Sequence, residues 1–158
     1  MPDLLVPLYR LPPRGLGEGT SAVPGVNIRR PNTFESTVVR EFIKSNFSQS
    51  WADEVAATFS RQPVTSFIAV EDGKVAGFAA FDSTRRAFFG PTGVAVSQRG
   101  RGIGKALLIA ALWGLYDIGY AYGIIGAAGP VEFYAQTVGA IVIPDSVPGI
   151  YADLLKRD

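Results

Sequence analysis

The chain has 158 residues, of which 47% are hydrophobic and 18% charged, a composition that predicts one globular domain rather than a disordered chain. Its 15 basic and 14 acidic residues nearly cancel, which argues against nucleic acid as the main partner. The sequence contains no Cys and no His, so disulfides, thiolate nucleophiles and the commonest metal ligand and general base are excluded. No metal site is therefore expected.

No stretch approaches the roughly 18 consecutive apolar residues that a membrane-spanning helix needs, so no membrane segment is expected. The N-terminus lacks a basic start and carries Asp3, unlike a secretory signal. These features predict a cytoplasmic protein.

The N-terminal 25 residues have a composition of their own. Leu4–Leu11 is largely apolar and predicts a short strand or a packed arm, whereas Pro12–Gly25 is rich in Pro and Gly and predicts a loop or link. We therefore expect residues 1–25 to form an arm and linker and residues 26–158 to form the main domain.

The first half of that domain begins with a short strand at Val26–Arg29. A helix over Phe34–Ser45 follows, with Asn32 or Thr33 as its cap, and a second helix over Ser50–Ser60 has its first residue as the cap.

The middle of the chain reads as three strands. Ser66–Val70 and Val75–Phe81 flank an Asp-Gly turn, which is typical of a hairpin, and Ala87–Val96 is the third strand. Residues of this third strand that argue for a bulge or a close backbone approach are Gly90, Pro91 and Gly93.

The clearest helix of the sequence spans Ile103–Ile118, where apolar residues recur at helical spacing. A strand at Tyr120–Ile125 and a short helix at Val131–Val138 come next. Ala140–Ile143 and Ile150–Leu155 are possible closing strands. This order of strands and helices predicts a mixed α/β fold.

The segment before the long helix carries the main functional signal. Gly100, Gly102 and Gly104 alternate with other residues, which leaves their backbone N–H groups uncovered at the positive end of the helix dipole. This arrangement favours a phosphate or diphosphate ligand. The charged side chains at the rim are Arg99, Arg101 and Lys105.

Two familiar phosphate loops do not fit this segment. A P-loop needs Gly where Arg99 stands and a hydroxyl where Ala106 stands. A dinucleotide-binding fingerprint needs its third Gly one position later than Gly104.

The segment resembles motif A of the GNAT superfamily of N-acetyltransferases, Arg/Gln-x-x-Gly-x-Gly/Ala, matched here by Arg99, Gly102 and Gly104. The pair Phe133-Tyr134 on the next short helix adds to the likeness, which covers Val26 to the C-terminus. The resemblance implies a GNAT-like acyl-CoA N-acyltransferase fold with acetyl-CoA as co-substrate.

It also implies individual roles. The motif A loop would bind the coenzyme A diphosphate, the preceding strand would pair with the pantetheine arm, and Tyr134 would protonate the leaving thiolate. The loop residues are Arg99, Gly100, Arg101, Gly102, Ile103, Gly104 and Lys105, and the strand residues are Thr92, Gly93 and Val94.

The sequence departs from the family pattern near the C-terminus. The Asn that often precedes the Tyr helix is replaced by the stretch Gly126–Gly129, and the spacing from Tyr134 to Gly139 is one residue longer than usual. The general base is open: Asp82 and Glu132 are candidates, although each has the character of a surface carboxylate.

The function expected from the resemblance is acetyl transfer to a primary amine of a small molecule or peptide. The alternative is a non-catalytic module that binds or senses acetyl-CoA, and a pure interaction module would have no coenzyme A affinity. The sequence does not identify the acceptor. A homodimer through the C-terminal strands is a further expectation from the family.

Overall fold

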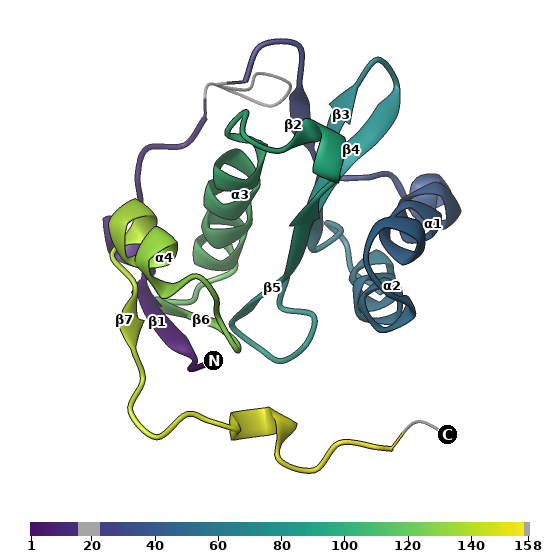
Figure 1. The fold of residues 1–158 in the computed structure, drawn as a ribbon. Coiled ribbons are helices and arrows are strands. Elements are labelled where there is room, and N and C mark those ends of the chain that lie inside the picture. Colours follow the sequence, from purple (N-terminus) through teal and green to yellow (C-terminus); the bar gives the residue numbers. More distant parts are fainter. Residues whose placement is uncertain (16–22, 157–158) are drawn as a thin grey trace.

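A mixed sheet of seven strands runs through the centre of the molecule (Figure 1). The computed structural model describes residues 1–15 and 23–156. The strands are β1 (Leu4–Pro7), β2 (Asn27–Arg29), β3 (Ser66–Glu71), β4 (Lys74–Phe81), β5 (Phe88–Val94), β6 (Tyr122–Ile125) and β7 (Ile141–Val142). Their order across the sheet is β2-β3-β4-β5-β6-β1-β7, and neighbours are antiparallel except for the parallel pair β5 and β6.

Helices cover both faces of this sheet (Figure 1). They are α1 (Ser36–Asn46), α2 (Gln49–Ala56), α3 (Ile103–Asp117) and α4 (Val131–Val138). Residues of α1 and α2 pack in one apolar cluster with β3 and β4, and residues of α3 and α4 pack in a second cluster on the opposite face. The mixed α/β layout predicted from the sequence is confirmed.

The predicted helices are present with small shifts at their ends. The helix at Val131–Val138 has the predicted bounds, and α3 ends one residue early at Asp117. The first helix begins as a 3₁₀ turn capped by Asn32. The cap of α2 is Ser48 rather than Ser50, because the Ser48 hydroxyl accepts the backbone N–H of Trp51 at 3.2 Å.

The predicted closing strand at Ile150–Leu155 is wrong. The chain there forms a 3₁₀ turn, Gly149–Tyr151, and then continues without regular structure to residue 156. Pro148 has no N–H to offer a neighbouring strand, and Gly149 has a φ of 59°, which turns the backbone out of an extended path.

The N-terminal strand lies inside the sheet, between β6 and β7. Leu4 pairs with Ile125 on one side and with Val142 on the other, and the side chains of Leu4, Val6 and Leu8 are fully buried. The main fold therefore includes the segment that the sequence suggested as an arm before Val26. Much of the predicted linker, residues 16–22, lies outside the described residues.

Since β1 is an interior strand of the sheet, truncating its inward side chains should destabilise the whole domain. We expect Leu4→Ala to lower the free energy of unfolding by about 2–5 kcal/mol, as for other buried leucines. Leu5→Ala, on the other face of the same strand and only partly buried, should cost clearly less. Equal values in urea denaturation would contradict the difference in burial between the two faces of β1.

No helix of residues 1–15 and 23–156 is long and apolar enough to cross a membrane.

Candidate active site

The two central strands β5 and β6 pair over a very short distance. Their parallel ladder consists of Phe88 opposite Ile124 and Phe89 opposite Ile125, after which β6 ends. β5 continues to Val94, still paired with β4 but no longer with β6 (Figure 1). The edge of β5 that faces away from β4 is therefore open beyond Phe89, and we call this opening the fork.

A β-bulge lies where the fork begins. Between the pair Ala79–Thr92 and the pair Phe81–Phe89, β4 advances by two residues and β5 by three. The extra residue falls at Gly90-Pro91, so the bulge predicted from these residues is confirmed. Such a bulge bends the strand, which fits the separation of β5 from β6.

The backbone of β5 directs polar groups into the fork. The N–H of Ala95 donates to the oxygen of Ala76 at 2.9 Å, and bonded and non-bonded pairs alternate along antiparallel strands. Val94 and Thr92 therefore belong to non-bonded pairs, and their N–H and C=O groups point away from β4. Arg99 Nε donates to the Val94 oxygen at 3.1 Å, whereas no described residue accepts the Val94 N–H.

The loop between β5 and α3 presents a row of backbone donors. Gly100 and Gly102 have φ values of 82° and 86°, in the left-handed region that glycine adopts without strain, and Gly102 caps α3. Among the described residues, no protein group accepts the N–H groups of residues 100–105. These donors stand at the positive end of α3, which is the arrangement that binds phosphate.

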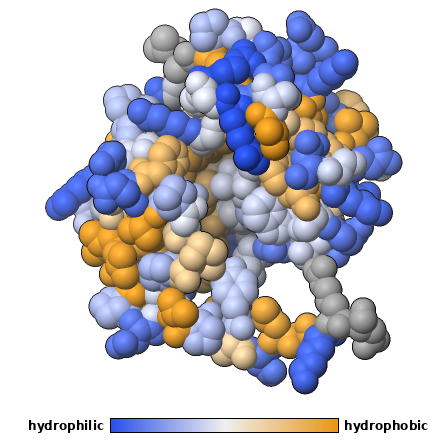
Figure 2. Space-filling view, in the orientation of Figure 1, coloured by the Kyte–Doolittle hydropathy of each residue, from blue (hydrophilic) through white to orange (hydrophobic). Residues whose placement is uncertain are grey.

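The fork and the loop border a single groove of about 480 Å³. Figure 2 shows the hollow in the middle of the front face, below the hydrophilic loop. Every cofactor-binding residue predicted from the sequence lines it except Arg101. The lining residues are Phe47, Trp51, Thr92, Gly93, Val94, Gln98, Arg99, Gly100, Gly102, Ile103, Gly104, Lys105 and Phe133.

Arg101 points away from the groove, contrary to the prediction that it contributes charge to the cofactor site. Its guanidinium pairs with Glu71 at 2.6 Å, and it also donates to Gln98 and, at 3.5 Å, to the oxygen of Pro24. The hydrogen bond from Arg101 lowers the pKa of the Glu71 carboxyl. The side chain fastens the loop to the hairpin of β3 and β4, so its charge is already balanced.

The comparisons with known proteins bear on this site directly. A family model described as the acetyltransferase (GNAT) family matches residues 32–125, which include the bulge, the loop and α3. The chain belongs to the GNAT family. A comparison with curated proteins finds no match.

Solved GNAT structures share the fold at low identity. A GCN5-related N-acetyltransferase from Sphaerobacter thermophilus is 20% identical with a TM-score of 0.64, over 90% of this chain and 48% of that one. A GNAT acetyltransferase from Brucella melitensis in complex with acetyl-CoA is 21% identical with a TM-score of 0.58, over 75% and 88%.

A third similar structure is the glucosamine N-acetyltransferase region of a fungal multi-domain GH3 β-N-acetylglucosaminidase. It is 18% identical with a TM-score of 0.69, over 90% of this chain and 19% of that one. The chain thus spans less than half of this protein and of the Sphaerobacter protein.

In this GNAT domain, Tyr134 lies in the core rather than in the wall of the groove. Its side chain is 8% exposed and meets Phe89 edge-on, with 6.4 Å between the ring centroids. Burial raises the pKa of its phenol, so the hydroxyl stays protonated at neutral pH. The groove is lined instead by its neighbour Phe133. Tyr134 therefore approaches the closed end of the fork, beside Phe89, from the α3 face.

Neither carboxylate considered as a general base has a free position at the groove. Asp82 is buried and receives hydrogen bonds from Arg61 at 2.6 Å, Tyr120 at 3.0 Å and the backbone N–H of Ala87 at 2.7 Å. These three donors give Asp82 a structural role. Glu132 is exposed and accepts the side-chain amide of Gln136 at 2.8 Å.

The aromatic side of the groove was largely missed from the sequence. Trp51, on α2, lines the groove. Phe47 lies in the turn between α1 and α2, where no periodic pattern marks it. It packs 5.4 Å from Trp51 and 5.6 Å from Phe78, measured between ring centroids. Gly93 leaves the space that this ring needs, because a Cβ there would lie 2.5 Å from Phe47.

This contact predicts a specific coupling between two positions. Gly93→Ala should lower the free energy of unfolding by about 1–3 kcal/mol, since the methyl group displaces the Phe47 ring. In a Phe47→Ala background the same substitution should cost much less. A double-mutant cycle in urea measures the difference, and additive costs would show that Phe47 does not set the requirement for glycine.

Proposed function

We propose that this protein transfers the acetyl group of acetyl-CoA to a primary amine of a small molecule or peptide. The observation that carries the proposal is the row of backbone N–H groups at residues 100–105, next to the open edge of β5, that no group in residues 1–15 and 23–156 accepts. The fit is chemical: a diphosphate needs clustered donors and positive charge, and an extended amide-containing arm needs an unpaired strand edge.

Different residues of the chain bind the co-substrate and polarise its acyl carbonyl. The loop amides, with Arg99 and Lys105 in the wall of the groove, hold the anionic part of the co-substrate. The N–H of Val94 faces the fork and is placed to polarise a carbonyl there. Acetyl-CoA supplies the activated acetyl group when bound.

The transfer requires two proton movements. The amine nitrogen bonds to the acyl carbon as the carbon–sulfur bond breaks, so the nitrogen loses a proton and the sulfur gains one. We assign the proton that the sulfur gains to the Tyr134 hydroxyl, as the family resemblance implies. The non-catalytic alternative is not favoured, because the matching family model is one of acetyltransferases.

The anion site predicts which arginine matters for binding. Arg99→Ala should weaken acetyl-CoA binding about tenfold in calorimetry, because a charged group in the wall of the groove is lost. Arg10→Ala removes the same charge from an exposed position beside Tyr9 and is the matched control. Equal losses would mean that only net charge matters, and no binding by the unaltered protein would reject the proposal.

The acid role of Tyr134 predicts a separate effect. Tyr134→Phe keeps the ring that packs on Phe89, so stability and acetyl-CoA affinity should change little. Turnover with an amine acceptor should fall at least tenfold because the thiolate loses its proton donor. An unchanged kcat, measured together with the calorimetric Kd, would show that another group supplies the proton.

A further inference from the structure

The C-terminal segment crosses below the fork, from β7 toward α2 (Figure 1). Two hydrogen bonds at Asp3 hold its start: the N–H of Ile143 donates to the Asp3 oxygen at 2.9 Å, and the Asp3 N–H donates to Ser146 Oγ at 2.9 Å. Beyond this anchor the segment meets the body again at Gly149, where a Cβ would lie 3.3 Å from Asp3 Oδ2. The segment therefore borders the fork at the end opposite the motif A loop.

Tyr151 brings a hydroxyl group from this segment to the closed end of the fork. A Cβ built on Gly126 would lie 3.6 Å from the Tyr151 hydroxyl. Gly126 directly follows Ile125, the last residue of β6 that pairs with β5. The same Cβ would lie 3.0 Å from the ring of Phe88, so the hydroxyl stands where the two strands part.

The second group of this region is a carboxylate on α2. Glu54 lies one helical turn after Trp51, which lines the groove, so the two side chains are neighbours on the surface of α2. Thr84 donates a hydrogen bond to Glu54 Oε2, whereas Oε1 accepts none from any described residue. Burial raises the pKa of Tyr151, and the negative charges of Glu54 and Asp3 raise it further.

These two carboxylates are not equivalent. Asp3 Oδ1 already accepts the backbone N–H of Ala127 at 2.8 Å, and the chain around Asp3 anchors the C-terminal segment. Glu54 is half-buried, and its Oε1 accepts no hydrogen bond from a described residue. Of the two, Glu54 is the one placed to receive a ligand.

We infer that Glu54 and Tyr151 form the acceptor end of the site, which takes a primary amine with an apolar body. This inference rests on the proposed acetyl transfer and names its acceptor side. The ammonium group binds Glu54, the Tyr151 hydroxyl positions the nitrogen by a hydrogen bond, and the apolar body packs on Trp51 and Phe47.

In the same position, Glu54 can deprotonate the bound ammonium group. One N–H bond of the ammonium breaks and one O–H bond forms on Glu54, so the proton moves to the carboxylate and the electron pair stays on nitrogen. No other reactant is needed for this step. An apolar acceptor is favoured because the wall on this side of the groove includes the aromatic rings of Phe47 and Trp51.

The test uses the full chain, saturated with coenzyme A, and 2-phenylethylamine as the probe in calorimetry. Glu54→Gln should weaken probe binding at least tenfold and leave the coenzyme A Kd within about twofold. Asp53→Asn is the matched control, since Asp53 is exposed on the same helix and bonded to Gln49. Loss of probe binding in Glu54→Gln alone supports the inference, and equal affinity in both variants overturns it.

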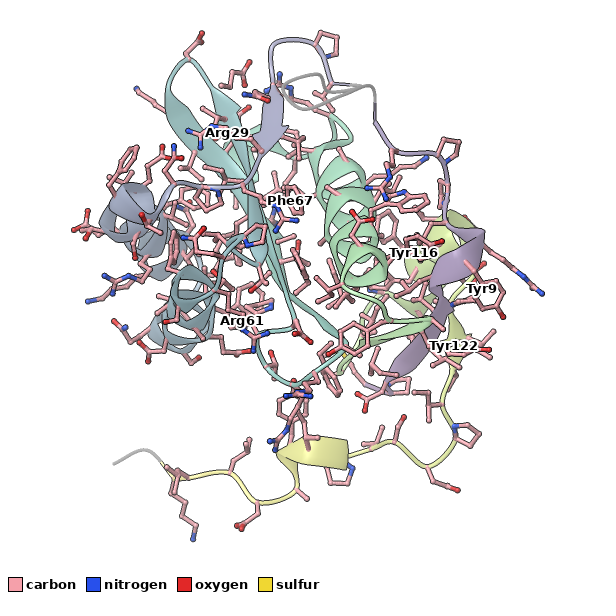
Figure 3. The ribbon with its side chains drawn as sticks, turned by 180° about the vertical axis from the view of Figure 1, so that it is seen from behind. Tyr9, Arg29, Arg61, Phe67, Tyr116 and Tyr122 are labelled. Carbon is pink, nitrogen blue, oxygen red and sulfur yellow. The ribbon has the colours of Figure 1, made fainter. Side chains whose placement is uncertain are left out.

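Tyr151 has its own variant and control. Tyr151→Phe should raise the KM for 2-phenylethylamine several-fold and weaken its binding to the coenzyme A complex. Tyr116→Phe, a partly exposed tyrosine on α3 seen from behind in Figure 3, should do neither. Unchanged binding and KM in Tyr151→Phe would remove this residue from the acceptor end.

The acceptor class is tested by comparing 2-phenylethylamine with a hydrophilic amine as substrate. The unaltered protein should acetylate 2-phenylethylamine with a higher kcat/KM than glucosamine, and a preference for glucosamine would overturn the apolar class. If the protein binds coenzyme A and acetylates amines but Glu54→Gln behaves as the unaltered protein, this inference fails and the proposed function stands. If coenzyme A does not bind at all, the proposed function fails as well.

Discussion

The site depends on a pairing that β5 and β6 do not make. Two residues of each strand form the parallel ladder, and then the bulge at Gly90-Pro91 carries β5 away while β6 ends. An unpaired strand edge inside a sheet is costly unless water or a ligand satisfies its polar groups. The chain places such an edge beside a second set of unpaired donors at the start of α3, and both sets face one groove.

The rest of the domain supports that opening from its two faces. On one face, α3 and α4 fill the core up to Tyr134, which packs on Phe89 at the closed end of the fork. On the other face, the ring of Phe47 sits over Gly93 and forms part of an aromatic wall. β1 holds β6 from its far side, so the N-terminal strand, remote in sequence, fixes one arm of the fork.

The sequence predicted what depends on local chemistry and missed what depends on long-range pairing. The glycines of the loop, the bulge at Gly90-Pro91 and the bounds of α4 follow from backbone preferences of neighbouring residues, and each was found. The insertion of β1 between β6 and β7 has no local signal, since an apolar strand reads the same at an edge or at the centre.

The side chains at the site show the same division. Arg101 has the residue type and position of a phosphate ligand, but it forms an ion pair with Glu71, thirty residues away in sequence. Tyr134 follows Phe133, which lines the groove, whereas its own ring packs on Phe89. Tyr151 lay in a segment read as a strand, so its approach to Gly126 was not foreseen.

The most direct test of the central claim is the amide NMR spectrum of the protein titrated with coenzyme A. The backbone N–H signals of Gly100, Gly102 and Gly104 should shift together with that of Val94, and their hydrogen exchange should slow on binding. Saturable binding that leaves these amides unshifted and unprotected would contradict the claim that they hold the diphosphate.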